Sequence, residues 1–125
     1  MAKISSFEDL IIWQESMDIS IELYDEFKEC RDFALRDQIL RASLSVPLNI
    51  SEGFERSNNK EFANFLRYAK GSSGEVRTQI IFAQRVGLIE ERKAEKLIVR
   101  LIRLSKQIQS LRNSIKSRLD KNGEK

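Results

Sequence analysis

The residues of this chain whose types and spacing could do chemistry gather between positions 41 and 56. The polar residues there recur every three or four positions, a spacing that places them on one face of a helix; they are Arg41, Ser45, Asn49, Glu52 and Arg56. Pro47, the only proline of the chain, lies in the same segment. Because proline lacks the helical N–H and clashes with the carbonyl four residues earlier, we expect the helix to kink at Pro47.

The polar stripe has two interpretations, and the sequence leaves both open. In the structural one, Asn49 bonds a carbonyl freed by Pro47, and Glu52 pairs with an arginine of the stripe or with a residue of the next helix. In the functional one, the same residues line a polar pocket or the lumen of a ring, and Gly53 permits close approach of the backbone.

A second segment, Gly71-Ser72-Ser73-Gly74, could cradle a phosphate group. A phosphate-binding loop of the Walker type needs a strand before the glycines and its lysine after them, whereas Lys70 precedes them here. Small residues inside a helix also permit close helix packing, and Gly71 and Gly74 would then accept the kinked neighbouring helix. The sequence favours the packing interpretation.

The composition argues against catalysis. The chain has no histidine and a single cysteine, Cys30, which excludes Ser-His and Cys-His nucleophile pairs, histidine-containing di-iron sites and cysteine zinc sites. Glu52 and Glu75 could meet across two helices and hold Mg²⁺, as paired carboxylates do in nucleases, but no third ligand or base accompanies them. We therefore expect a non-enzymatic protein with no catalytic residue, no bound metal and no cofactor.

Charge is unevenly distributed along the chain. The formal total is +3, yet residues 1–30 carry a net −6 and residues 88–125 a net +6. Acidic residues of the first helical segment share one face of it; they are Glu8, Glu15, Asp18, Glu22, Asp25, Glu26 and Glu29. Basic residues that share one face of the last segment are the predicted nucleic-acid-binding set; they are Lys93, Lys96, Arg100, Arg103 and Arg118.

Three interpretations of the two stripes stay open. Both can be solvated helix faces. Alternatively, the acidic stripe of one subunit can meet the basic stripe of the next in a head-to-tail contact that closes into a ring. In the third interpretation, the basic stripe binds the phosphates of a nucleic acid by displacing counterions. The last two are compatible, since repeated subunits multiply a weak patch.

The hydrophobic pattern predicts an all-α fold, with a single domain over residues 1–119 and a frayed tail over 120–125. Four helices are expected, and their approximate ranges are 8–29, 33–56, 59–86 and 90–119. The short connections favour antiparallel neighbours, so the predicted architecture is an up-down four-helix bundle.

Local signals mark the ends and the apolar faces of these helices. Asp32 and Asn58 are expected to cap the second and third helices, and Gly87 is expected to end the third. The apolar row predicted for the first helix consists of Leu10, Trp13, Met17, Ile21 and Tyr24. The last helix carries a heptad-like apolar seam from Ala94 to Ile115.

The sequence also favours a cytoplasmic location. It contains no apolar run long enough to cross a membrane, and its first residues lead into acidic residues instead of an apolar signal core. A single cysteine cannot form an internal disulfide, which suits a reducing compartment. We expect no membrane partner.

Taken together, these motifs resemble one family, the four-helix-bundle proteins encoded in intervening sequences of bacterial 23S rRNA genes. The matching motifs are Arg41-Ala42, Ser45-Val46-Pro47, Asn49-Ile50, Glu52-Gly53, Arg56, Phe62, Phe65-Leu66, Ala69-Lys70-Gly71-Ser72, Glu75 and Gly87. Phe7 to Leu10 and Trp13-Gln14 are also similar, so the resemblance covers about residues 7–116. Ser51 and Gly74 depart from the family, which usually has Ala and a larger residue there.

The resemblance implies an antiparallel bundle that assembles into a homo-oligomeric ring, with a pentamer as the expected size. It brings no assigned biochemical activity. A distantly similar group, the accessory proteins of diversity-generating retroelements, is implicated in binding nucleic acid and a reverse transcriptase.

We therefore hypothesise that this protein binds RNA or DNA, or a nucleic-acid-processing protein, through its basic last helix. The alternative is a structural or protein-binding scaffold without nucleic-acid affinity, in which the charge stripes serve subunit assembly.

Overall fold

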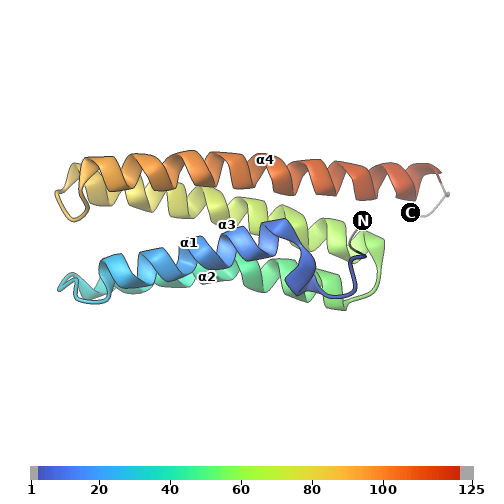
Figure 1. The fold of residues 1–125 in the computed structure, drawn as a ribbon, viewed down its shortest axis with the longest axis horizontal. Coiled ribbons are helices and arrows are strands. Elements are labelled where there is room, and N and C mark those ends of the chain that lie inside the picture. Colours follow the sequence, from blue (N-terminus) through green and yellow to red (C-terminus); the bar gives the residue numbers. More distant parts are fainter. Residues whose placement is uncertain (1–2, 122–125) are drawn as a thin grey trace.

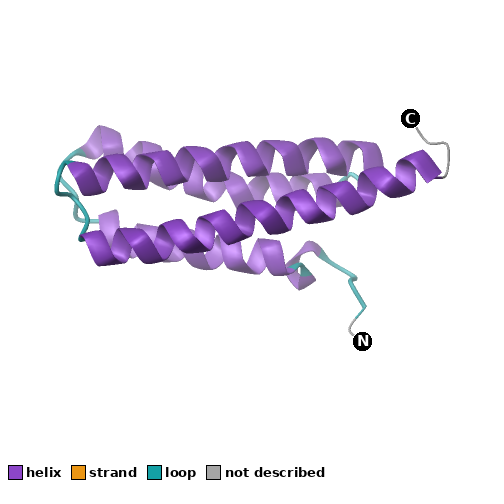
Figure 2. Cartoon of the chain, turned by 90° about the horizontal axis from the view of Figure 1, so that it is seen from above, coloured by secondary structure: helices purple, strands orange, loops and turns teal. Residues whose placement is uncertain are grey.

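The computed structural model describes residues 3–121, which form one 3₁₀ turn and four α-helices and no strand. The elements are η1 (Phe7–Asp9), α1 (Ile11–Phe27), α2 (Phe33–Glu55), α3 (Asn59–Arg85) and α4 (Glu91–Lys121). Figures 1 and 2 show the helices lying side by side, with short connections at the two ends. The all-α fold of four helices expected from the sequence is confirmed.

The helix ends follow the expected chemistry. The side chain of Asp32 accepts a hydrogen bond from the Leu35 amide at the start of α2, and Asn58 accepts one from the Glu61 amide at the start of α3. Gly87 has a φ of +81°, in the left-handed region that glycine adopts without strain, and it ends α3. These three predictions are confirmed.

A single apolar core runs between the four helices. The predicted seam of α4 lies in it, with Ala94, Leu101 and Ile108 almost fully buried. α2 packs closely against α1 and α3, and α4 packs against α3, whereas α1 and α4 make few close backbone contacts. The seam between α1 and α4 therefore depends more on side chains than on close helix packing.

The predicted apolar row of α1 faces the core only in part: Leu10 and Trp13 are partly buried and pack against the core. Ile21 and Tyr24 are exposed. The buried face of α1 lies beside this row and consists of Ile12, Ser16, Ile19, Ser20, Leu23 and Phe27. Two serines interrupt that face, so its apolar pattern is weaker in the sequence, yet their small size fits the close packing of α1 on α2.

The turn η1 precedes α1 and carries a capping box. The side chain of Asp9 accepts hydrogen bonds from the backbone N–H of Ser5 and of Ser6, at 3.0 and 3.1 Å. The pKa of Asp9 is lowered from its ordinary 3.8, mainly by the Ser5 amide and next by the Ser6 amide, because both donors stabilise the charged carboxylate.

At the other end of the chain, α4 remains helical through Lys121. Asp120, expected in a frayed tail, is therefore part of the helix. The expected fraying of residues 122–125 lies outside the described residues. Within residues 3–121, none of the helices has the length and apolar character needed to cross a membrane. α2 is assigned as one helix with Pro47 buried inside it, and the kink at Pro47 stays a prediction.

Candidate nucleic-acid interface and polar groove

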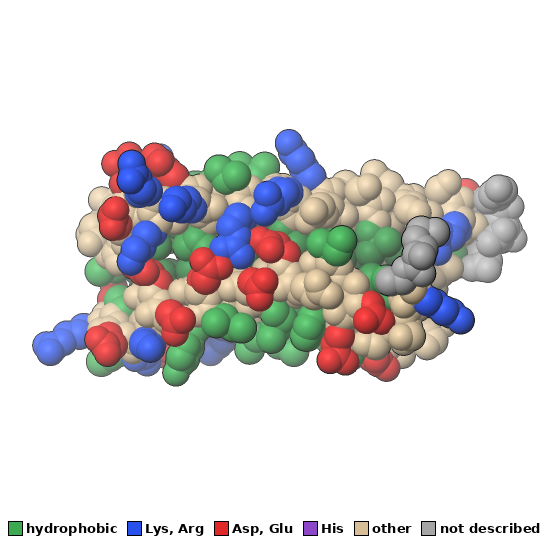
Figure 3. All heavy atoms as spheres, viewed as in Figure 1, with side chains coloured by type: hydrophobic (Ala, Val, Ile, Leu, Met, Phe, Trp, Pro, Cys, Tyr) green, Lys and Arg blue, Asp and Glu red, His purple; other side chains and the backbone are tan. Residues whose placement is uncertain are grey.

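The basic stripe of α4 lies on the flank of that helix that faces α1. The Arg100 guanidinium donates to Glu15, with Nε and Oε1 2.8 Å apart, and also to Glu22. Lys93 lies 3.3 Å from a carboxylate oxygen of Glu26. Figure 3 shows the resulting mixture of basic and acidic side chains where α4 borders α1. The two stripes thus meet within one chain, and these pairs need no neighbouring subunit.

Arg100 is the centre of this seam. Its side chain and that of Glu15 are only 24% and 21% exposed. Partial burial acts to lower the pKa of Arg100, but its hydrogen bonds to Glu15 and Glu22 more than offset this, so the pKa is raised. Arg100 is therefore a fixed positive charge that holds two carboxylates of α1 against α4.

The other members of the predicted nucleic-acid-binding set differ in their surroundings. Arg103 also approaches Glu15, at 3.8 Å, but is 59% exposed. Lys96 and Arg118 are exposed and form no ion pair within the described residues. Part of the predicted stripe is thus engaged by carboxylates of its own chain, and its binding to nucleic acid stays a prediction.

A second group of cations lies on the other flank of α4 and on the neighbouring flank of α3. The Arg112 Nε donates to the Ala63 carbonyl at 3.0 Å, which shows that this flank of α4 faces α3. The helical repeat places further basic residues on these two flanks, or on the solvent-facing side of α4 next to its α3-facing flank. We call this set the α3–α4 basic surface; it comprises Arg67, Lys70, Arg77, Lys106, Arg112 and Lys116.

Within residues 3–121, no member of the α3–α4 basic surface forms an ion pair with a carboxylate. The Arg67 guanidinium lies over the neighbouring Tyr68 ring, 5.0 Å from its centroid. Our sequence reasoning missed this surface because its cations are divided between two helices. The spacing of Arg67, Lys70 and Arg77 places them on one face of α3, and this was the sequence signal that could have revealed the surface.

The polar stripe of α2 faces α3. The hydroxyl oxygens of Ser45 and Ser72 lie 2.6 Å apart and join the two helices. The Asn49 amide donates to the Ser45 carbonyl at 2.8 Å. The prediction that Asn49 bonds a carbonyl freed by Pro47 is therefore wrong, because that carbonyl belongs to Ser43 and Asn49 reaches back only one turn.

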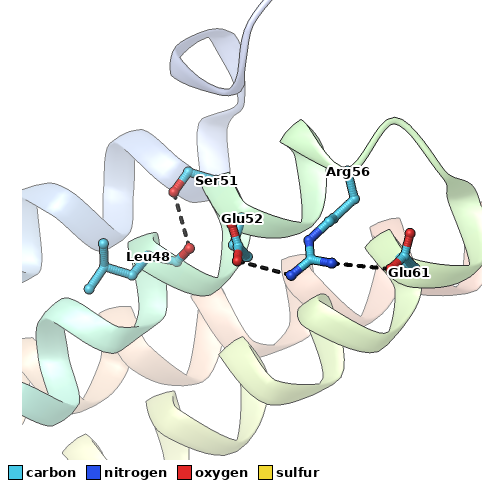
Figure 4. A network of polar contacts seen from close by, with 5 residues as sticks. All are labelled: Leu48, Ser51, Glu52, Arg56 and Glu61. Carbon is cyan, nitrogen blue, oxygen red and sulfur yellow. Dashed lines mark hydrogen bonds and ion pairs between the residues drawn. The ribbon is translucent and has the colours of Figure 1, made fainter.

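The far end of the stripe forms a small ionic network (Figure 4). Arg56 lies 3.2 Å from Glu52, one turn earlier in α2, and 3.4 Å from Glu61 in the first turn of α3. The expected pairing of Glu52 with an arginine of its own stripe is confirmed. All three side chains are about half exposed, so the network links the end of α2 to the first turn of α3 but stabilises the fold little.

The motif glycines Gly53, Gly71 and Gly74 differ in how closely a neighbouring helix approaches them. A Cβ added to Gly53 would lie 2.6 Å from the Cβ of Phe65, so Gly53 is required for the close approach of α2 and α3. A Cβ added to Gly71 or Gly74 would meet nothing within 4 Å. The prediction that these two glycines accept a neighbouring helix is therefore wrong within the chain.

The two carboxylates considered for a magnesium site do not come together. The contact between Ser45 and Ser72 sets the register of α2 and α3. In that register Glu52 and Glu75 are displaced by ten residues along the helices, or roughly 15 Å. Across residues 3–121, no group of three or more potential metal ligands is found.

The later part of the predicted apolar row of α1, from Met17 to Tyr24, borders a groove against α2. The groove has a volume of about 210 Å³, and its lining residues are Met17, Ser20, Ile21, Tyr24, Leu40, Ser43 and Leu44. Ile21, Tyr24 and Leu44 are each about half exposed, at 54%, 56% and 46%. Contiguous exposed apolar side chains are a common feature of protein-binding surfaces.

The comparisons with known proteins agree with the motifs and the four helices. The model of the family described as 23S rRNA-intervening sequence protein matches residues 8–110. The chain belongs to this family. A solved structure from Bacteroides thetaiotaomicron, described as a protein with unknown function from the S23 ribosomal protein family, is similar at a TM-score of 0.75 and 21% identity. The match covers 81% of this chain and 97% of that one, and at this identity it shows the fold alone. No curated protein sequence matches the chain.

Proposed function

We propose that this member of the 23S rRNA-intervening sequence family is a non-catalytic, nucleic-acid-binding helical bundle, and that it binds through the α3–α4 basic surface. The observation that carries the proposal is the lack of carboxylate partners around this surface. α3 and α4 together contain fifteen basic and five acidic residues.

The electrostatics favour this surface over the α1-facing flank of α4. A phosphate near Arg100 would compete with Glu15 and Glu22, which already occupy its donors. Near Lys70 and Arg77, a phosphate would meet cations without such competitors. Phosphate binding by lysine and arginine releases condensed counterions, and this gain supplies most of the sequence-independent affinity for nucleic acid.

The test compares two charge-matched double variants. Lys70→Glu with Arg77→Glu reverses two charges of the α3–α4 basic surface, and Lys96→Glu with Arg118→Glu reverses two unpaired charges of the predicted stripe. We expect the first variant to bind a labelled single-stranded RNA at least tenfold more weakly than the wild type, and the second to change binding much less. The reverse order would assign binding to the predicted stripe, and equal small effects would refute both sites.

The apolar groove between α1 and α2 supports a second, compatible function, assembly. We propose that the up-down bundle forms a homo-oligomeric ring in which this groove lies at the subunit contact, as the family resemblance leads us to expect. Ile21→Glu places a charge in the groove without disturbing the core, since Ile21 is 54% exposed. It should reduce the mass measured by light scattering, whereas Val99→Glu, at an exposed site on α4 (62% exposed), should not. An unchanged mass for Ile21→Glu would exclude the groove from the contact.

A further inference from the structure

A polar pocket between α2 and α3 contains much of the sequence motif and has no part in the nucleic-acid-binding surface proposed above. Its volume is about 320 Å³, and its lining residues are Gln38, Arg41, Ala42, Ser45, Ser72, Glu75 and Gln79. This volume is at the lower end of the range of small-molecule sites. Of these residues, only Ala42 is apolar.

Facing side chains line the pocket in successive helical turns. The hydroxyl contact between Ser45 and Ser72 fixes the antiparallel register at one end. Each further turn brings the next polar residues of α2 and α3 to the same level. The facing pairs are Ser45 and Ser72, Arg41 and Glu75, and Gln38 and Gln79.

Only the first of these pairs is joined by a hydrogen bond. Among the described residues, Arg41 and Glu75 form no ion pair with each other or with another residue. The Oε1 atom of Gln79 is buried and has no hydrogen-bond donor. A buried acceptor without a donor is costly. The pocket therefore presents a buried amide oxygen without a donor, next to an exposed cation and an exposed carboxylate that pair with no other residue described in the structure.

These three groups define the chemistry of a ligand. Glu75 and the Gln79 oxygen offer it acceptors, and Arg41 offers it donors. A carboxylate is satisfied best by two adjacent donors. Among the nucleobases, only guanine has two adjacent donors on its Watson–Crick edge, N1–H and N2–H₂, and it also offers O6 and N7 as a pair of acceptors to arginine.

The surface of α3 allows a nucleic-acid strand to reach this pocket from the α3–α4 basic surface. Lys70 and Arg77 lie on the flank of α3 toward α4, and Glu75 lies on the flank toward α2. Gly71 and Gly74 lie between them, and the space beside each is open. Backbone Cα atoms lie only about 2.3 Å from a helix axis, whereas side chains extend to about 5 Å or more. Because Gly71 and Gly74 have no side chain, the surface of α3 between its two flanks lies closer to the helix axis there.

We propose that the pocket binds an unpaired guanine base of a single-stranded nucleic acid whose phosphates follow the α3–α4 basic surface. Glu75 accepts from N1–H and N2–H₂, Arg41 donates to O6 and N7, and Gln79 supplies a further acceptor. This inference rests on the proposed function, and it adds a base preference that phosphate contacts alone cannot give.

The experiment uses the full chain and labelled uridine-rich decamers that differ only at one central base, which is guanine, inosine or adenine. Inosine lacks the N2 amino group. We expect the guanine strand to bind about tenfold more tightly than the other two, since each well-formed bidentate contact discriminates by about 5- to 150-fold.

The variant Glu75→Gln tests the site more sharply, because it should change the affinity for the guanine strand and for the other two strands in opposite directions. Loss of a negative charge should slightly strengthen binding of the inosine and adenine strands, while loss of the carboxylate should weaken binding of the guanine strand. Glu95→Gln, the same charge change on an exposed part of α4 outside the pocket, should strengthen binding of all three strands equally.

The possible failures are distinguishable. Equal binding of the three strands would overturn the guanine site and leave the proposed function intact, whereas no binding of any strand would overturn both. A Glu75→Gln variant that changes the mass in light scattering, with no change in base preference, would assign the pocket to a subunit contact and also overturn the guanine site.

Discussion

Replacing Arg100 with methionine tests whether its ion pairs hold α1 against α4. Methionine keeps an unbranched stem in a half-buried position and removes the guanidinium. The change breaks the 2.8 Å bond to Glu15 and the bond to Glu22. It leaves Glu15, which is 21% exposed, with only the longer contact to Arg103 at 3.8 Å.

The magnitude follows from the burial of the two partners. A hydrogen bond to a charged group contributes about 1.5–3 kcal/mol, and an exposed ion pair less than about 1 kcal/mol. Glu15 lies between these limits, and Glu22, 54% exposed, adds little. We therefore expect a loss of about 1–2 kcal/mol in unfolding free energy. With an unfolding entropy of about 2.1 cal/mol/K per residue, this lowers Tm by about 4–8 °C.

Urea unfolding, followed by circular dichroism, measures this loss. Lys96→Met is the matched control, because Lys96 lies on the same flank of α4 without an ion pair in the described structure. The difference between Arg100→Met and the wild type should shrink at about 1 M salt, where the Debye length falls to about 3 Å. If Arg100→Met is as stable as Lys96→Met at low salt, the seam contributes nothing and the reasoning is refuted.

Three further predictions follow from the packing and the pKa shifts. Gly53→Ala should lower the unfolding free energy by about 1–3 kcal/mol, because the new methyl group overlaps Phe65, and an unchanged urea midpoint would contradict this. Gly71→Ala, made at an open site of the same bundle, should raise it by about 0.5–1 kcal/mol through helix propensity; a loss of stability there would show that Gly71 is packed. The pKa of Asp9 is lowered, so the stability that its carboxylate gives to η1 is complete above about pH 4 and is lost as the pH falls through the folded-state value. Titration of the Asp9 carboxyl by NMR should give a value below 3.8, and a higher value would exclude the capping box in solution.

Much of the fold could be predicted because the signals are local. The seam of α4 repeats over its whole length, and Asp32, Asn58 and Gly87 mark helix ends by chemistry that acts within a few residues. α1 was less predictable. It carries two neighbouring apolar rows, and the row that is fully buried is the one that serines interrupt.

The candidate site was only partly predictable, because periodicity tells which residues share a helix face but not which helix that face meets. The charged stripes of α1 and α4 could be recognised from the sequence, but only the tertiary packing shows that they contact each other within one chain. The α3–α4 basic surface was missed for the same reason, since Lys70 and Arg112 belong to different helices. The motif residues of α2 and α3 were all identified, yet only the register of the two helices places Arg41 opposite Glu75 and separates Glu52 from it.

The most direct test of nucleic-acid binding is the salt dependence of the wild-type affinity for a labelled single-stranded RNA, measured by fluorescence anisotropy at a known assembly state. For single strands, the logarithm of the binding constant falls with the logarithm of salt by about 0.7 per phosphate neutralised. Three or more phosphates on the α3–α4 basic surface predict a slope of about −2 or steeper, reduced by about 1.4 in Lys70→Glu with Arg77→Glu. No binding at about 50 mM salt, or a slope near zero, would contradict the proposed function.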